Sequence, residues 1–192
     1  MAYSTTCFVE CDQVNDITSF IDGSAVYGSD SHRELSLRVG TDSCYLKTSE
    51  NGKLLPKNDD GLENAGGDGS EFFVAGDIRA NEQIGLVAMH TLFVREHNLL
   101  CDDIIATYPA ADPEQQYQLA RKIVGAEIQV ITYKEFLPAL LGPMAPDVDG
   151  YSGYNESVNP SICKLCKAFG FVGCLFCPVP DDTFCAFLVH SQ

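Results

Sequence analysis

The clearest pattern in the chain is the spacing of apolar residues between 79 and 105. They recur at roughly the spacing of one face of an α-helix. Tyr108-Pro109 follows, and the residue before a proline is disfavoured in the α region, so the helix should end there. The pattern predicts a helix over 77–106 whose apolar face contains Ile84, Val87, Leu92, Val94, Leu99 and Leu100.

A second helical region follows this proline. Asp112 is suited to cap a helix, and Pro113 to occupy its first position. Thr132 and Glu135 have the spacing of a capping box, which predicts a short further helix that stops near Gly142-Pro143.

The first 70 residues lack this period and are rich in Gly, Ser, Asp and Asn. Such composition predicts loops, turns and short helices instead of a regular sheet. The chain has no internal repeats and no heptads. We therefore predict a mainly α fold with helices over 77–106 and 112–142, long loops and little sheet.

The composition is strongly acidic, since 27 Asp and Glu oppose 12 Lys and Arg and give a net charge of −15. A surface of this sign repels phosphate backbones and anionic lipid. The first residues lack the basic and apolar regions of a signal peptide. The longest apolar stretch, 168–180, is too short to span a bilayer. We expect neither a nucleic-acid partner nor membrane insertion.

The nine cysteines form two groups. Cys7, Cys11, Cys44 and Cys101 are scattered, which is compatible with disulfides in a secreted protein. The other five lie in 163–185, where two CxxC pairs permit a four-thiolate zinc site. The short, apolar segment between these pairs favours buried or unpaired thiols over zinc.

Oxygen-bearing groups fall on alternate residues of segment 18–24. In an extended stretch the Thr18, Asp22 and Ser24 side chains share one face, and the Phe20 carbonyl can join them. Hard oxygen donors from one short loop suit calcium, although a second acid would have to come from elsewhere. The residues by themselves favour a polar turn before a short helix.

Segment 75–83 combines a cation with two acids. Asp77 is placed to cap the helix that follows, and Arg79 and Glu82 would project from one face of its first turn. In an arbitrary helix such a pair is a solvated salt bridge. A functional role requires that both side chains face a bound group, and the enzymatic hypothesis depends on this condition.

These segments resemble the animal haem peroxidases, the family that includes peroxidasin, peroxinectin and myeloperoxidase. TSFIDGSAVYGS at 18–29 is similar to the family's calcium loop, and AGDIRANEQ at 75–83 is similar to its haem-facing segment. The motifs MHTL, REHN, ARKIVGA and ITYKEFLP follow in the family's order. The resemblance implies a partial haem peroxidase domain over 1–162 and a divergent, Cys-rich tail over 163–192.

The resemblance also implies roles for individual residues. Arg79 matches the family's catalytic arginine, a cationic fork that stabilises negative charge as the peroxide bond breaks. Glu82 matches a carboxylate that can form an ester with haem, so haem b and calcium are the implied cofactors. Gln83 stands where myeloperoxidase has a haem-linked methionine, so that link is not expected. The implied calcium ligands are Thr18, Phe20, Asp22 and Ser24.

The histidines are expected to have different roles. His90 and His97 are expected to serve helix packing and hydrogen bonding, and His32 to be exposed. The family's distal histidine lies upstream of the calcium loop, so we expect this chain to lack it. His190 weakly resembles the family's proximal iron ligand and is a candidate for that role.

The implied activity is haem-dependent reduction of hydrogen peroxide, coupled to oxidation of a halide, phenol or tyrosine donor. Without a distal histidine, this chain is expected to have little activity alone. The alternative is a non-catalytic, calcium-stabilised interaction module derived from a peroxidase. Relatives work outside the cell or in oxidising compartments, which implies an extracellular location for this protein.

Overall fold

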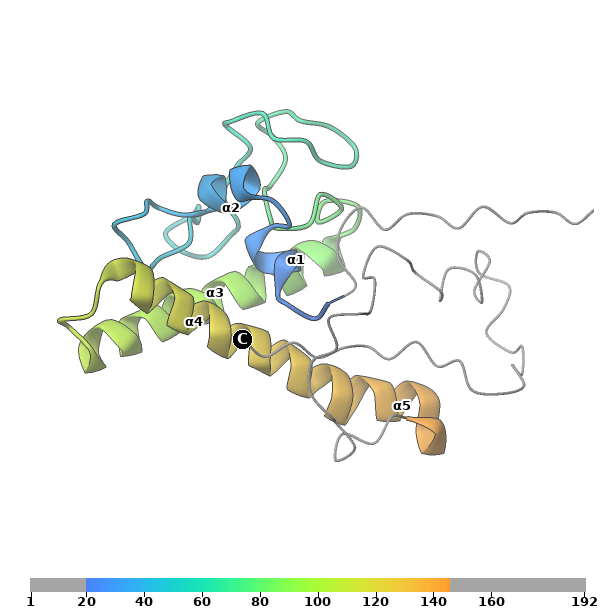
Figure 1. Ribbon diagram of the computed structural model, residues 1–192. Coiled ribbons are helices and arrows are strands. Elements are labelled where there is room, and N and C mark those ends of the chain that lie inside the picture. The colour runs from blue at the N-terminus through green and yellow to red at the C-terminus, as the bar shows by residue number, and fades with distance from the viewer. Residues whose placement is uncertain (1–19, 146–192) are drawn as a thin grey trace, which may run out of the picture. The chain divides into compact units, whose positions relative to one another are not determined.

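The computed structural model describes residues 20–145 of the chain. Helices dominate these residues, and the backbone contacts between extended segments are isolated bridges, not strands. The expected mainly α fold with little sheet is therefore confirmed. In chain order (Figure 1), the helices are α1 Ser24–Tyr27, α2 Ser31–Leu37, α3 Ile84–Thr107, α4 Pro113–Ile131 and α5 Leu137–Leu141.

The two long helices, α3 and α4, form an antiparallel hairpin and run side by side (Figure 1). The turn at 108–112 joins them, and α3 ends at Thr107, just before Tyr108-Pro109, as predicted. Asp112 caps α4 by accepting the Glu114 backbone N–H at 3.2 Å, and Pro113 takes the first helical position. Both of these predictions are confirmed.

The predicted start of the first long helix at residue 77 is wrong, because α3 begins at Ile84. Gln83 has an extended backbone, with φ −153° and ψ 155°, so no helix continues through it. Its side chain caps α3 by accepting the Gly85 N–H at 3.0 Å. Asp77 instead accepts the Arg79 N–H at 2.8 Å, which stabilises a turn.

The predicted capping box at Thr132 is also wrong. Thr132 has helical backbone angles, and α4 continues through one π-helical turn, Thr132–Phe136, directly into α5. Preceding carbonyls therefore satisfy the N–H groups that a cap would serve, and the Thr132 hydroxyl donates to the Ile128 carbonyl at 2.7 Å. The predicted end is confirmed, since α5 stops at Leu141 and a short 3₁₀ turn, Gly142–Met144, follows.

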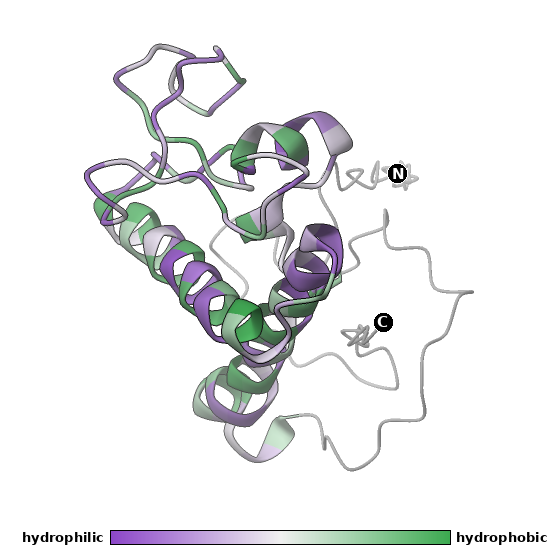
Figure 2. Cartoon of the chain, turned by 90° about the vertical axis from the view of Figure 1, so that its left-hand side faces the viewer, coloured by the Kyte–Doolittle hydropathy of each residue, from purple (hydrophilic) through white to green (hydrophobic). Residues whose placement is uncertain are grey.

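The core lies between the α3–α4 hairpin and a layer of short helices and loops over 21–83. Figure 2 shows hydrophobic residues along both long helices and at intervals in the loops. Buried residues of the loop layer cover the core on the side opposite the α3–α4 hairpin. The loop layer is therefore part of the packed core. The main buried apolar residues are Val26, Tyr27, Leu37, Leu46, Leu55, Leu62, Val74, Ala75, Ala80, Val94, Tyr117 and Val124.

Side chains replace regular ladders as the hydrogen-bond partners of this loop layer. The Asn58 amide is almost fully buried and bonds to both backbone groups of Leu62 and to the Asp68 carbonyl. The Asn81 amide bonds in the same way to both backbone groups of Phe73. Buried backbone groups need such partners where no helix or sheet supplies them.

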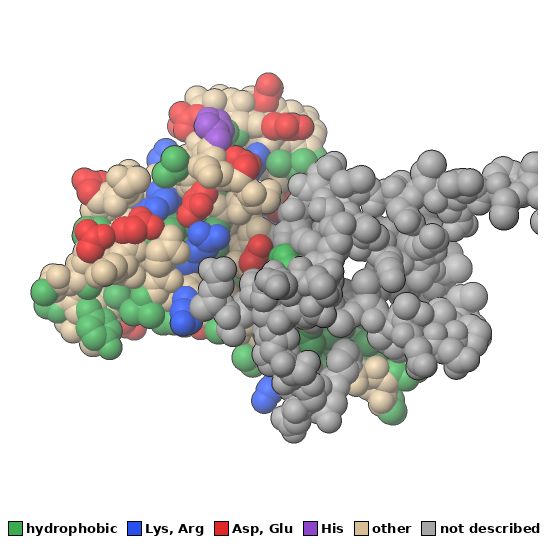
Figure 3. All heavy atoms as spheres, in the orientation of Figure 1, with side chains coloured by type: hydrophobic (Ala, Val, Ile, Leu, Met, Phe, Trp, Pro, Cys, Tyr) green, Lys and Arg blue, Asp and Glu red, His purple; other side chains and the backbone are tan. Residues whose placement is uncertain are grey.

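The surface carries many charges of both signs, which are interspersed on the face seen in Figure 3. No helix in the described range 20–145 has the length and apolarity needed to cross a membrane.

Candidate haem-facing segment and calcium loop

The predicted calcium loop leads into α1 through a tight turn. The Asp22 carboxylate accepts the Ser24 N–H at 2.9 Å, and Gly23 between them has φ 74°, a conformation that favours glycine. Gln129 of α4 donates to the Ile21 carbonyl at 2.7 Å, which fixes this end of the loop. Thr18 lies outside the described residues, so the full set of calcium ligands stays a prediction.

The segment that carries Arg79 packs directly against α1. A Cβ atom added to Gly76 would lie 2.2 Å from the Ser24 carbonyl oxygen and 2.5 Å from the Gly28 nitrogen, so only glycine fits. The Asp77 N–H donates to the Ala25 carbonyl at 3.2 Å. The calcium loop and the haem-facing segment, far apart in the sequence, therefore share one backbone contact.

Arg33 holds the same segment from the side of α2. Its side chain is buried, and its guanidinium donates to the Ala75 carbonyl at 2.7 Å and to the Glu63 carbonyl. Burial lowers the pKa of Arg33, and the two carbonyl acceptors offset part of the cost of burying its charge. These contacts fix the backbone just before Arg79.

Arg79 forms a forked ion pair with Asp77. Its Nε donates to Oδ1 at 2.9 Å and its Nη2 to Oδ2 at 2.6 Å. This hydrogen bond is the main reason that the pKa of Asp77 is lowered and that of Arg79 is raised. The Asp77 side chain is 13% exposed and that of Arg79 is 54% exposed, so the pair presents a fixed cation at the surface.

The expected projection of Arg79 and Glu82 from one helical turn is wrong. Both lie in the turn that precedes α3, where the Glu82 N–H donates to the Arg79 carbonyl at 3.0 Å. Glu82 is exposed, and residues 20–145 alone do not enclose either side chain. Residues 20–145 by themselves do not close a pocket around the pair, so the expectation that both side chains face a bound group stays a prediction.

His90 adds a polar atom to this site. Its Nδ1 donates to the Leu86 carbonyl at 2.7 Å, one helical turn back. Nε2 is buried and has no partner among the described residues. A charge on His90 also contributes to lowering the pKa of Asp77, which places the ring in the neighbourhood of the ion pair. The packing role expected for His90 is thus accompanied by an unused ring nitrogen.

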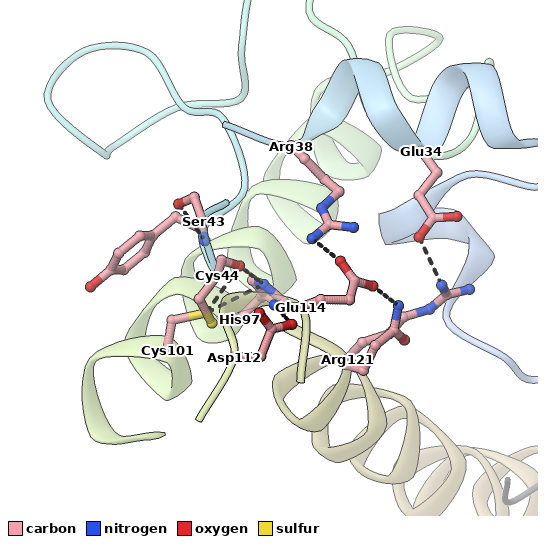
Figure 4. A network of polar contacts seen from close by, with 11 residues as sticks. Glu34, Arg38, Ser43, Cys44, His97, Cys101, Asp112, Glu114 and Arg121 are labelled. Atoms are coloured by element: carbon pink, nitrogen blue, oxygen red, sulfur yellow. Dashed lines mark hydrogen bonds and ion pairs between the residues drawn. A yellow bond between two sulfur atoms is a disulfide. The ribbon is translucent and has the colours of Figure 1, made fainter. Parts of the chain in front are cut away.

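His97 has the structural role predicted for it. It is fully buried in α3 and bonds at 2.9 Å to the Tyr27 hydroxyl through Nδ1 and at 2.9 Å to the Cys44 carbonyl through Nε2. Cys44 forms a disulfide with Cys101, which confirms one of the expected disulfides (Figure 4). His32 is exposed, also as predicted.

Two ion pairs connect α4 to the region of α2 (Figure 4). Arg38, just after α2, is 4% exposed and contacts Glu114 at 2.5 Å, and this bond is the main cause of the lowered pKa of Glu114. Arg121 contacts Glu34 at 3.0 Å. These pairs position the elements that surround His97.

The sequence model of the animal haem peroxidases, described as "Animal haem peroxidase", matches residues 3–174. The chain belongs to the animal haem peroxidase family. The family match extends past 162 into the Cys-rich segment, where we had expected the similarity to end. His190 and most of this segment remain outside both the match and the described residues.

Animal haem peroxidases from distant organisms align with the chain. Myeloperoxidase of Homo sapiens is 40% identical over 166 residues, which cover 80% of this chain and 22% of that protein. Peroxidasin of Drosophila melanogaster is 39% identical over 164 residues, which cover 80% of this chain and 11% of that protein. The chain thus spans less than a quarter of the length of these relatives.

Solved structures show the same relationship. Peroxidase A from Dictyostelium discoideum is 33% identical with a TM-score of 0.63, over 73% of this chain and 28% of that one. A fatty acid alpha-dioxygenase from Oryza sativa is 33% identical with a TM-score of 0.51, over 64% of this chain and 18% of that one.

Proposed function

We propose that the described segment forms one side of a haem site, and that the protein reduces hydrogen peroxide while oxidising a halide, a phenol or a tyrosine donor. The observation that carries this proposal is the Arg79–Asp77 pair, which fixes a guanidinium while leaving it half exposed. Membership of the animal haem peroxidase family supports the cofactor. The aligned residues cover only 22% of myeloperoxidase of Homo sapiens, so further segments can complete such a site.

Three features of the described residues support a haem on this side of the protein. A flat, anionic cofactor calls for a fixed cation, an apolar surface and polar groups that lack internal partners. Arg79 supplies the cation, Ile84 is an apolar side chain that is 88% exposed, and the buried His90 Nε2 has no partner within residues 20–145. Glu82 is exposed nearby in sequence and is the proposed residue for an ester bond with haem b.

When bound, haem supplies the iron and the porphyrin that accept oxidising equivalents from peroxide. The protein's part is orientation and charge. Arg79 keeps its proton at every relevant pH, because the bond to Asp77 raises its pKa further. Its free donors can stabilise negative charge on an oxygen of bound peroxide without reorganisation. His190, which lies outside the described residues, would be the iron ligand.

Calcium binding is the second part of the proposal. Thr18, the Phe20 carbonyl, Asp22 and Ser24 would be the ligands, and a carboxylate from elsewhere would complete them. Support comes from the turn in which Asp22 already accepts the Ser24 N–H. Because Gly76 contacts the Ser24 backbone, an ordered calcium loop would also order the segment that carries Arg79.

An extracellular location also remains a proposal. The Cys44–Cys101 disulfide supports it, because disulfides persist in oxidising compartments. The alternative function, a calcium-stabilised interaction module, is favoured by one observation. Arg79 and Glu82 are both exposed, as contact residues for a partner would be.

Haem uptake tests the proposed haem site. Titration of the full chain with haemin should produce a Soret band, and Arg79→Ala should weaken binding or shift the band. Arg95→Ala is the matched control, because Arg95 is an exposed arginine on α3 that has no role in the proposal. Absence of a Soret band in the wild type, or identical titrations for both variants, would reject the haem site.

Turnover provides a second measurement on the same samples. We expect the isolated chain to oxidise a phenol with peroxide only slowly, because a distal proton-transferring histidine is not part of the proposed set. Rapid oxidation would contradict this expectation. Haem uptake combined with no turnover at all would favour the interaction module.

A further inference from the structure

A buried aromatic cluster in the core contains Tyr27, His97 and Tyr117. Their ring centroids are 5.4 Å apart for Tyr27–His97, 6.0 Å for Tyr27–Tyr117 and 5.2 Å for His97–Tyr117, and all three contacts are edge-on. All three side chains are completely buried. Packing alone needs no polar groups here, so the hydrogen bonds within the cluster call for an explanation.

The direction of the bond between Tyr27 and His97 follows from their other partners. The Cys44 carbonyl can only accept, so His97 Nε2 carries the proton and donates to it at 2.9 Å. His97 Nδ1 is then an unprotonated acceptor, and the Tyr27 hydroxyl donates to it at 2.9 Å. The Tyr27 phenol thus donates to a neutral imidazole, and the other nitrogen of that imidazole donates to the Cys44 carbonyl.

We propose that Tyr27 and His97 form a redox-active pair that stores one oxidising equivalent as a neutral tyrosyl radical. Loss of one electron from the Tyr27 phenol is accompanied by transfer of the hydroxyl proton to His97 Nδ1. The products are a tyrosyl radical and an imidazolium that still donates to the Cys44 carbonyl. Return of one electron reverses the proton transfer. The physiological oxidant would be the peroxide-oxidised haem, and in this respect the inference rests on the proposed function.

The electrostatic environment permits this step. Burial raises the pKa of Tyr27, so the phenol stays protonated until it is oxidised. Burial is also the main reason that the pKa of His97 falls to about 4, while the bond to Cys44 opposes the fall. A neutral imidazole of that basicity still accepts a proton readily from an oxidised phenol, which is a strong acid. Arg38 and Arg121 also lower the pKa of His97 and make the pair a stronger oxidant.

Tyr117 provides a comparison inside the same cluster. It is as buried as Tyr27, but its hydroxyl has no hydrogen-bond partner within the described part of the chain. Oxidation of Tyr117 would leave the proton without an acceptor. The Arg38 guanidinium lies 3.7 Å from the centre of its ring, closer than the 5.2 Å between Arg121 and the ring of Tyr27, so it disfavours a positive charge on Tyr117 more strongly. We therefore expect Tyr117 to be redox-silent.

The test uses the full chain without haem. A flash-generated ruthenium(III) polypyridyl complex serves as the one-electron oxidant, and samples are frozen for electron paramagnetic resonance. Radicals on exposed tyrosines such as Tyr108, which is 56% exposed, are lost by coupling between molecules. A persistent tyrosyl signal is expected in the wild type and in Tyr117→Phe. It should be lost in Tyr27→Phe.

A second measurement keeps the hydroxyl in place, in case Tyr27→Phe does not fold. A fluorotyrosine at position 27 should split the persistent signal through its fluorine nucleus. Electron–nuclear double resonance should show one exchangeable proton hydrogen-bonded to the radical oxygen. A persistent signal that is unchanged in folded Tyr27→Phe, or one without fluorine splitting or an exchangeable proton, would overturn the proposal. Because no haem is present, this result is independent of the Soret titration.

Discussion

The cluster around His97 and the segment around Arg79 belong to the same family pattern, but their polar groups are arranged in opposite ways. His97 is fully buried, and each of its ring nitrogens has a partner 2.9 Å away. Arg79 is 54% exposed and uses only its inner edge, toward Asp77. A buried polar group whose hydrogen bonds are all made stabilises one conformation of the chain. A polar group that is held in place but still has exposed donors is suited to bind a ligand.

The two regions are nevertheless mechanically linked. Tyr27, which bonds to His97, ends α1, and the backbone of α1 touches Gly76 just before the Arg79 turn. The buried cluster around His97, the inner region, therefore positions the exposed segment around Arg79, the outer region. Changes in the inner region should therefore mainly affect stability, and changes in the outer region should mainly affect ligand binding.

The largest expected effect comes from opening the disulfide. Cys44→Ala combined with Cys101→Ala should lower the free energy of unfolding by about 4 kcal/mol, because the bond closes a long loop in the unfolded chain. Urea unfolding monitored by circular dichroism measures this. The wild type should lose a similar amount in reductant, whereas the double variant should change much less. Equal stability of the two proteins under oxidising conditions would contradict the scaffold role.

Gly76→Ala is expected to cost about 3 kcal/mol, since the added methyl group would overlap backbone atoms that cannot move aside. Gly125→Ala is the matched control, because a Cβ atom at this helical position meets nothing within 4 Å. That control should be neutral or stabilise the protein by up to about 1 kcal/mol. Thermal unfolding compares the two. Similar melting temperatures would show that α1 and the Arg79 turn are not in contact.

His97 should make stability depend on pH. Its pKa falls from 6.5 to about 4 on folding, so below pH 6.5 the unfolded chain binds a proton that the folded chain does not. Stability is therefore complete above pH 6.5 and falls by roughly 2 kcal/mol or more as the pH drops toward 4. Urea unfolding across this range should show a steeper loss for the wild type than for His97→Gln. Parallel curves would mean that His97 titrates normally in the folded protein.

Arg79→Ala should have the smallest effect on stability, about 0.5 kcal/mol or less, because solvent screens the half-exposed Arg79 side chain and Asp77 keeps the hydrogen bond from the backbone N–H of residue 79. The pKa of Asp77 should rise toward its ordinary value, since the bond from Arg79 is the main cause of its depression. Nuclear magnetic resonance titration of the Asp77 carboxyl group measures this shift. A loss of several kcal/mol would place Arg79 among the scaffold residues instead.

The sequence predicted those features that depend on neighbouring residues. Asp112 with Pro113 marks the start of α4, and Tyr108-Pro109 marks the end of α3, because each acts on backbone groups within one turn. The start of α3 could not be predicted in the same way. Asp77 is equally suited to cap a helix and to stabilise a turn, and the choice depends on its contact with Ala25.

Features that depend on distant residues were predicted only in part. Motif resemblance identified Arg79 and the calcium loop as a pair of sites, but not the contact of Gly76 that joins them. Scattered cysteines indicated disulfides without their pairing, because 57 positions separate Cys44 from Cys101. The unused Nε2 of His90 could not be recognised, since its burial and its lack of a partner are properties of the folded chain.

The position of the disulfide also determines how the protein should be produced. Segment 75–83 lies inside the covalent ring that Cys44 and Cys101 close. The disulfide therefore limits the conformations that this segment can adopt when it unfolds locally. Expression in a reducing bacterial cytoplasm would yield the same polypeptide with that ring open. Material for haemin or radical experiments should therefore come from a periplasmic or secreted preparation, with the thiol content checked beforehand.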